Sequence, residues 1–261
     1  MNCYIIGHPL AKPRSVTLWK KYFKSKNLRI KMGPLDIAPQ NFNSLIQSLK
    51  KDKYFLASAI TMPFKKKILR FTEFGDLLTK KAKASNLIIK KNNRLFAYNT
   101  DVQGALKSIG NRNYNKIMIY GLGGAGLAIF NVLYDSFKKT HFFLITSKNK
   151  NNFHNKRIKL TKNIELNDFK DIDLFINCSP LGSNLKKNYV KKTPLDKKLL
   201  QFAKKKLFIF DIVYKPKVTI LNRLCKTLKI NYQNGLQMNT IQAEEAISKV
   251  IKNYEKPVSK Q

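Results

Sequence analysis

The fold is decided by the stretch KIMIYGLGGAGLAIFNVL, residues 116–133. Its first five residues form an apolar run typical of a buried strand. The glycines at 121, 123 and 126 then follow a G-x-G-x-x-G spacing, and the apolar residues from Leu127 onward have the pattern of a helix. Strand, glycine turn and helix in this order are the context that a dinucleotide fingerprint requires. The stretch therefore predicts a Rossmann-type unit in the middle of the chain.

The glycines of this loop have separate tasks. Gly121 allows a tight turn, Gly123 allows the backbone to approach a pyrophosphate closely, and Gly126 allows the helix to pack against the strand. We expect the loop to bind the cofactor through Gly121, Gly123, Gly124, Ala125 and Gly126. A glycine turn with a purely structural role is the alternative.

The end of the next expected strand bears on which dinucleotide is bound. An NAD enzyme places an acidic residue there, about twenty residues after the loop, to hold the ribose hydroxyls. This chain has Thr146-Ser147-Lys148-Asn149-Lys150 instead, with two lysines and no carboxylate. A 2′-phosphate fits such a segment better, so the sequence favours NADP over NAD, with Thr146 and Lys148 as candidate contacts.

Short apolar runs alternate with amphipathic stretches along the whole chain. The runs predict strands at residues 4–7, 29–32, 55–61, 116–120, 142–146, 173–177 and 207–212. The amphipathic stretches predict helices near residues 16–23, 42–49, 195–204, 219–228 and 236–250. This alternation is typical of α/β proteins with parallel, buried sheets. The length of 261 residues suits two domains, with a boundary in a helix that starts near Val102.

Composition excludes several classes of protein. No apolar run approaches the ~20 residues of a membrane span, and the first residues are expected to form a strand, so a cytoplasmic protein is predicted. The three cysteines and three histidines lack ligand spacing, so neither a disulfide framework nor a metal site is indicated.

The formal net charge is +36, from 51 basic and 15 acidic residues. Clustered Lys and Arg side chains bind nucleic-acid phosphates. Here the lysines are spread along the whole chain, so no specific nucleic-acid partner is predicted. A polyanion site remains the minority interpretation.

Three polar residues precede the glycine loop, each at an expected boundary of a strand or helix. Lys65 follows a strand and a proline, Pro63, that would start a helix at its first turn. Asn86 precedes a short strand, and Asp101 precedes a helix that it could cap. Taken singly, Lys65 is a solvated lysine and Asp101 a cap. A parallel sheet, however, brings strand ends together at the edge where ligands bind, which predicts a proton-transfer pair of Lys65 and Asp101.

Six ordered motifs resemble those of the shikimate dehydrogenase family, and they extend over most of the chain. The family motifs NVTxPxK and NTD are similar to residues 59–65 and 99–101, with the asparagine-bearing strand start at Asn86 between them. Further on, NATxxG, DxxYxP and GxxM…QA are similar to residues 177–182, 211–216, and 235–238 with 242–243.

The resemblance implies NADP-linked, reversible reduction of 3-dehydroshikimate to shikimate in aromatic amino-acid synthesis. It implies an N-terminal parallel-sheet substrate domain, residues 1–101 and 236–261, whose last helix returns from a Rossmann-type NADP domain, residues 102–235. The partner would be a small-molecule substrate, and the chain a monomer or homodimer.

The resemblance also assigns roles to residues. Lys65 would pass a proton to the carbonyl oxygen, and Asp101 would hold its ammonium group. The substrate would contact Thr61, Asn86 and Gln242 through its hydroxyls, Ser15 through its carboxylate, and Tyr214 at the floor of a cleft. Gly235 joins the cofactor contacts.

The chain departs from the family pattern at four positions near these motifs: Pro13 replaces a serine, Ala59 an asparagine, Leu87 a threonine and Ser147 an arginine. The departures leave two alternatives open. One is a relative acting on quinate or another polyhydroxy acid, and the other is an inactive polyanion-binding protein with the same fold.

Overall fold

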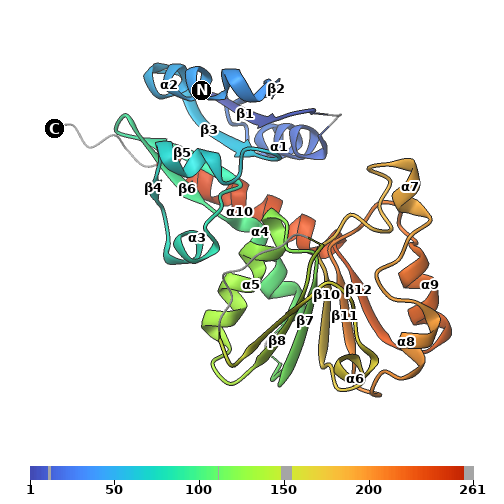
Figure 1. Cartoon of the computed structure of the whole chain (residues 1–261). Helices are drawn as coiled ribbons and strands as arrows, with labels where there is room; N and C mark the ends of the chain where they lie inside the picture. The colour runs from blue at the N-terminus through green and yellow to red at the C-terminus, as the bar shows by residue number, and fades with distance from the viewer. Residues whose placement is uncertain (11–12, 111, 148–154, 256–261) are drawn as a thin grey trace. The chain divides into compact units, whose positions relative to one another are not determined.

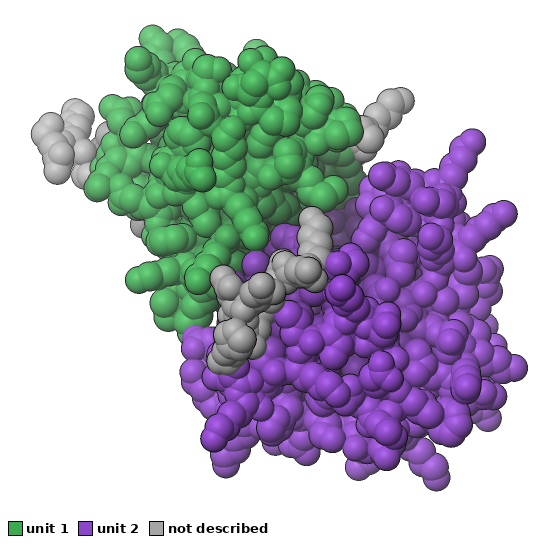
Figure 2. Space-filling model, viewed as in Figure 1, with its two compact units in different colours: residues 1–104, 240–261 green, residues 105–239 purple. Residues whose placement is uncertain are grey.

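The computed structural model describes residues 1–10, 13–110, 112–147 and 155–255, which form two compact units (Figures 1 and 2). Unit 1 comprises Met1–Gly104 and Thr240–Gln261, and unit 2 comprises Ala105–Asn239. The chain passes from one unit to the other within helices α4 (Thr100–Ile109) and α10 (Leu236–Tyr254). In the described ranges, no helix is long and apolar enough to cross a membrane.

Unit 1 contains a mixed sheet with the strand order β2-β1-β3-β5-β6-β4. Strands β2, β1 and β3 are parallel, whereas β5 is antiparallel to both β3 and β6. The bounds are β1 (Asn2–Gly7), β2 (Lys31–Asp36), β3 (Phe55–Ile60), β4 (Glu73–Phe74), β5 (Leu87–Lys91) and β6 (Arg94–Tyr98). The helical segments are α1 (Arg14–Ser25), η1 (Pro39–Asn41), α2 (Phe42–Lys51), η2 (Lys67–Phe71) and α3 (Leu77–Ala82).

Strand β5 runs against its neighbours because a tight hairpin joins it to β6. The hairpin residues Asn92 and Asn93 have φ values of 45° and 60°. Two consecutive residues with positive φ form the hairpin turn that matches the twist of antiparallel strands, and asparagine tolerates this region. The βαβ pattern predicted a parallel sheet in unit 1. The observed sheet is mixed, because β5 is antiparallel to its neighbours.

Two helical layers cover the sheet of unit 1. On one face, Trp19 and Phe23 of α1 pack with Ile247 and Val250 of α10 against alternate strand residues. On the other face, a second cluster brings α2 against the sheet through Phe42, Ile46 and Leu49. The alternation is visible in β5, where Leu87 and Ile89 belong to the first cluster and Ile88 to the second.

Two expectations for unit 1 are wrong in detail. Pro63 does not start an α-helix: turns follow it, and the helical piece is the short 3-10 segment η2. The carbonyl of Lys65 accepts a hydrogen bond from the Ser85 amide at 2.7 Å instead of entering a helix. The strand expected at residues 29–32 is β2, which starts later, at Lys31, and extends to Asp36. It can continue through Pro34 because it is an edge strand, where a proline is tolerated.

Unit 2 is built on a parallel sheet with the strand order β12-β11-β10-β7-β8-β9. The chain starts this sheet at β7 and adds β8 and then β9 on one side of it. Strands β10, β11 and β12 are added on the other side, so the order reverses between β7 and β10. The strands are β7 (Lys116–Tyr120), β8 (His141–Ile145), β9 (Ile158–Thr161), β10 (Leu174–Asn177), β11 (Phe208–Asp211) and β12 (Asn231–Asn234).

The helices of unit 2 connect these strands: α5 (Gly124–Ser136), α6 (Leu166–Phe169), α7 (Lys187–Val190), α8 (Lys197–Gln201) and α9 (Ile220–Thr227). Every residue of β10 and β11 is buried, as expected for central strands covered on both faces. The strand order reverses between β7 and β10, and Rossmann-type sheets bind dinucleotides at the carboxyl ends of the strands beside such a reversal. The predicted α/β class with a Rossmann-type unit is confirmed.

Candidate active site

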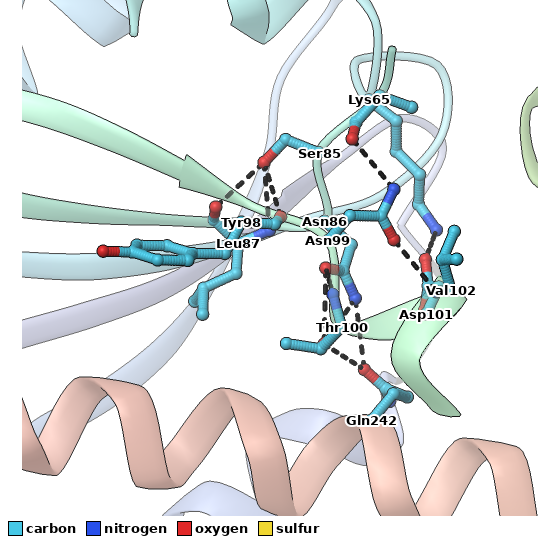
Figure 3. Close-up of polar contacts among 11 residues, drawn as sticks. Lys65, Ser85, Asn86, Leu87, Tyr98, Asn99, Thr100, Asp101, Val102 and Gln242 are labelled. Carbon is cyan, nitrogen blue, oxygen red and sulfur yellow. Dashed lines mark hydrogen bonds and ion pairs between the residues drawn. The ribbon is translucent and has the colours of Figure 1, made fainter. Parts of the chain in front are cut away.

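Lys65 and Asp101 form an ion pair in unit 1, between the Lys65 Nζ and Asp101 Oδ2 atoms. Lys65 lies in the turn after β3, and Asp101 lies in the first turn of α4. Figure 3 shows the two side chains pointing toward one another. Their side chains are 24% and 21% exposed, so the pair is partly shielded from water and still open to a small molecule.

Asp101 is not the N-cap of α4, contrary to the capping interpretation. Asn99 takes that role: its Oδ1 accepts a hydrogen bond from the Val102 amide at 3.1 Å, and its Nδ2 donates to the Ala84 carbonyl at 2.8 Å. This buried asparagine satisfies the helix end. The carboxylate of Asp101 is therefore available to pair with Lys65.

Asn86 and Gln242 meet beside this pair through Thr100 (Figure 3). The Oδ1 atom of Asn86 accepts a hydrogen bond from the Thr100 amide at 2.7 Å, and its Nδ2 donates to Thr100 Oγ1 at 2.9 Å. The same Nδ2 lies 3.3 Å from Gln242 Oε1 on α10. The chain thus brings together side chains from the start of β5, the start of α4 and the last helix.

Thr100 is a residue that the sequence reasoning missed. It is fully buried, and it contacts both Asn86 and Gln242. Thr100 lies between Asn99 and Asp101 in the NTD motif, and this position could have indicated that it belongs to the site. Its hydroxyl fixes the orientation of the Asn86 amide, which is a positioning task.

The other two expected substrate contacts of unit 1 lie at the ends of elements. Thr61 directly follows β3, and its amide donates to the Ile6 carbonyl at 2.9 Å. Ser15 lies half-buried in the first turn of α1. Pro13 occupies the N-cap position of that helix without any side-chain cap hydrogen bond. The roles of Thr61 and Ser15 remain predictions.

Two of the departures from the family pattern lie in the hydrophobic core. Leu87 is fully buried in the cluster beneath α1 and α10, and Ala59 packs against the same cluster. Both side chains fill core volume. Pro13, in contrast, lies at the N-cap of α1.

The glycine loop of unit 2 has the geometry that a dinucleotide needs. Gly121 has φ of +94°, which favours glycine. A Cβ atom on Gly126 would lie 1.9 Å from the Gly121 carbonyl oxygen. A Cβ on Gly123 or Gly124 would meet nothing within 4 Å, so the N-terminus of α5 faces open space where its amides can bind an anionic phosphate.

The remaining cofactor candidates are placed less completely. Thr146 follows β8, and its amide donates to the Thr161 carbonyl at 3.0 Å. Gly235 lies between β12 and α10, where a Cβ would come within 2.2 Å of the Ile212 carbonyl oxygen. Lys148 lies outside the described residues. Tyr214, a candidate substrate contact, follows β11 and is half-buried.

The cysteines are all buried, and burial raises the pKa of the Cys3 and Cys225 thiols to about 12. Such thiols are inert near neutral pH. Over the residues that the structure covers, no group of three or more His, Cys, Asp or Glu side chains could hold a metal ion.

Asp211, at the end of β11, is a fully buried carboxylate. Burial raises its pKa from 3.8 to about 6, although hydrogen bonds from the Val213 amide, Asn177 and Tyr232 act in the opposite direction. A raised folded-state pKa means that stability is fully present below the unfolded pKa of 3.8 and is lost as the pH rises through about 6.

We therefore expect Asp211→Asn to be more stable than the wild type well above pH 6. The gain is about 3 kcal/mol, because each pKa unit corresponds to about 1.4 kcal/mol. Well below pH 3.8, where the wild-type carboxyl is neutral in both states, the two proteins should be equally stable. Urea unfolding of both proteins across this range measures the difference, and a difference that does not change with pH would contradict the assignment.

An ammonium-carboxylate pair in one unit of an α/β chain and a glycine loop at a helix N-terminus in the other are features expected of a dehydrogenase. Residues 5–88 match a family model, which is described as the shikimate dehydrogenase substrate binding domain. Over these residues the chain is similar to the shikimate dehydrogenase family.

Relatives named shikimate dehydrogenase (NADP(+)) match nearly the whole chain. The protein of Clostridium beijerinckii is 28% identical over 250 residues, which cover 92% of this chain and 89% of the relative. That of Ignicoccus hospitalis is 25% identical over 245 residues, with coverage of 93% and 90%. A solved structure of shikimate 5-dehydrogenase from Thermus thermophilus in complex with NADP(H) and shikimate is 20% identical, with a TM-score of 0.77 and coverage of 96% and 93%.

Proposed function

We propose that this protein is an NADP-dependent shikimate dehydrogenase, which catalyses the reversible reduction of 3-dehydroshikimate to shikimate on the route to chorismate and the aromatic amino acids. The observation that carries the proposal is the Lys65–Asp101 ion pair beside the Asn86–Thr100–Gln242 cluster. Relatives with the same named activity over nine-tenths of the chain support it.

The chemistry divides between hydride and proton. Bound NADPH supplies the hydride that reduces the carbonyl carbon of the substrate. The Lys65 ammonium group donates a proton to the carbonyl oxygen, so that an alcohol forms. Asp101 holds the Lys65 amine in place as its charge changes. In the direction of shikimate oxidation, the neutral Lys65 amine accepts the hydroxyl proton.

Substrate hydroxyls contact Thr61, Asn86 and Gln242 in this proposal. Asn86 suits the task because its amide is fixed by two hydrogen bonds to Thr100, which reduces the entropy lost when a ligand binds. Ser15 at the start of α1 binds the carboxylate, and Tyr214 is a further substrate contact that the sequence motif implies. The position of Ser15 in a helical first turn favours an anion.

The cofactor binds along the carboxyl ends of the strands of unit 2. The Gly121–Gly126 loop, including Gly123, Gly124 and Ala125, would hold the pyrophosphate, and Gly235 lets the chain pass close to the Ile212 carbonyl just after β11. Thr146 and Lys148 bind the 2′-phosphate. The last assignment rests on the sequence, since it follows from the missing acidic residue after β8.

We infer that the protein acts in the cytoplasm on a small-molecule substrate, as a monomer or homodimer and without a specific nucleic-acid partner. The spread of its lysines along the chain supports the last point. The retention of the Lys65–Asp101 pair and of both amides beside it argues against an inactive polyanion-binding relative.

Pro13→Ser tests the substrate side. The new hydroxyl would restore a carboxylate donor, and it would also cap α1, which has no side-chain cap now. A hydrogen bond to a charged group contributes about 1.5 to 3 kcal/mol, so we expect KM for shikimate to fall by about tenfold or more with kcat nearly unchanged. Steady-state kinetics measures both constants.

Pro13→Ala is the matched control, because it removes the proline without adding a hydroxyl. Its KM for shikimate should stay near the wild-type value. If Pro13→Ser leaves KM unchanged while Arg14→Ala raises it strongly, the carboxylate contact has moved to Arg14. If neither variant changes KM, Ser15 and its loop do not hold the substrate.

Initial rates with shikimate and with quinate, each with NADP and with NAD, test the proposed function. We expect the highest kcat/KM for shikimate with NADP. Faster turnover of quinate would favour the alternative of a relative with an altered polyhydroxy-acid substrate. Preference for NAD would contradict the assignment of the segment after β8.

A further inference from the structure

The carboxylate of Asp211 is held by three hydrogen bonds inside unit 2. Its Oδ1 accepts from Asn177 Nδ2 at 2.9 Å and from the Val213 amide at 3.0 Å, and its Oδ2 accepts from the Tyr232 hydroxyl at 3.1 Å. Asp211 and Asn177 are both fully buried. The carboxylate therefore links the carboxyl ends of β10 and β11 to Tyr232 of β12.

Asn177 transmits this constraint to the turn that follows β10, residues 178–182. Its Oδ1 accepts from the Ser179 amide at 3.0 Å and from Ser179 Oγ at 2.7 Å. Ser179 Oγ in turn accepts from the Leu181 amide at 3.2 Å. Because Asp211 holds the Nδ2 side of the Asn177 amide, the Oδ1 side can only face the turn.

The turn packs directly against the dinucleotide loop. A Cβ atom on Gly121 would lie 2.8 Å from the Ser179 amide nitrogen, and one on Gly126 would lie 3.0 Å from Cys178 Cβ. These contacts leave no room for the turn to approach further, and a displaced turn would leave the loop unsupported. The geometry of the loop therefore depends on where Ser179 lies.

We propose that Asp211 is a positioning residue for the dinucleotide site: it fixes the Asn177 amide, which fixes the 178–182 turn against Gly121 and Gly126. This inference rests on the proposed function, because it takes NADP as the ligand of the loop. Asp211 does not touch the ligand in this account. Its effect reaches the loop through Asn177 and Ser179.

The test compares two substitutions of Asp211. Asp211→Ala removes the shorter of the two hydrogen bonds that Asn177 Nδ2 donates and leaves only the one to the Leu181 carbonyl at 3.4 Å, so the amide is held less firmly and Ser179 can shift. We expect Kd and KM for NADP to rise by about tenfold, the cost of one broken buried hydrogen bond, with kcat within about twofold of the wild type. Titration calorimetry with NADP alone gives Kd without turnover.

Asp211→Asn should rescue binding, because its carbonyl oxygen can accept from both Asn177 and Val213 while its amide faces Tyr232. Its Kd for NADP should stay close to that of the wild type. Tyr232→Phe is the matched control: it removes one hydrogen bond from the same carboxylate and leaves the Asn177 side intact. It should lower Tm without changing Kd.

An unchanged Kd for NADP in folded Asp211→Ala would overturn the inference, and so would a Tyr232→Phe variant that loses as much affinity. If Asp211→Ala does not fold, Asn177→Ser replaces it, since a serine cannot reach both Asp211 and Ser179, and an unchanged Kd there overturns the inference equally. Failure of the proposed function is distinguishable, because it is measured on the wild-type protein, which would then either not bind NADP or not reduce 3-dehydroshikimate with NADPH.

Discussion

Replacing Lys65 by alanine should lower kcat for shikimate oxidation by about 10² to 10⁴, the usual contribution of one proton-transfer group. The ion pair with Asp101 is the reason, since it aims the Nζ atom and holds it in a partly shielded site. Asp101→Ala should cause a loss in the same range. Because the two residues act as a unit, the double variant should be little worse than either single one.

Lys66→Ala is the control for this series. Lys66 is the next residue along the chain and is exposed, so its loss changes the local charge without touching the pair. Its kcat should equal that of the wild type. Near-normal kcat in Lys65→Ala, measured on protein with an unchanged Tm, would remove Lys65 from the mechanism.

Gly126→Ala should abolish NADP binding in the micromolar range and destabilise unit 2. The added methyl group would lie 1.9 Å from the Gly121 carbonyl oxygen, so the backbone of the loop must move. Overpacking of this kind costs about 1 to 3 kcal/mol, and we expect the upper end because the clash is with backbone. Thermal unfolding and calorimetric titration with NADP measure the two effects.

Gly124→Ala separates this clash from a general effect of alanine in the loop. A Cβ at Gly124 would meet nothing within 4 Å, and alanine has a higher helix propensity than glycine. Its Tm should therefore be unchanged or slightly higher. Equal destabilisation by the two substitutions would show that the loop does not have the close packing described.

Much of the fold could be predicted from local sequence, because strong signals marked it. The KIMIY run and its glycines predicted β7, the turn and α5 at nearly the observed bounds. The alternation of apolar runs predicted a parallel sheet in unit 2. Such patterns work when a strand is buried on both faces, since its residues are then nearly all apolar.

The errors occurred where a local rule had a competitor. Aspartate often caps helices, so Asp101 was a plausible N-cap. The N-cap is instead Asn99, two residues earlier, which accepts a hydrogen bond from the Val102 amide and also donates one to the Ala84 carbonyl. The hairpin at Asn92 and Asn93 gave only a weak turn signal, so the reversal of β5 was missed. Pro34 concealed the second half of β2.

The candidate site shows the same division between local and long-range information. The motifs named Lys65, Asp101 and Asn86, but no local rule could join Lys65 to Asp101 across 36 positions or Asn86 to Gln242 across 156. Only the folded chain brings them together. It also shows that Leu87 and Ala59 fill the core, which the sequence alone could not distinguish from changes in substrate contacts.

Incubation of the purified protein with 3-dehydroshikimate and NADPH tests the central claim most directly. We expect NADPH to be oxidised in equal amount to the shikimate formed, and Lys65→Ala to bind NADPH normally while forming shikimate at least about a hundredfold more slowly. The account would be contradicted by folded wild-type protein that binds NADPH and forms no shikimate, or by a Lys65→Ala variant that forms it at the wild-type rate.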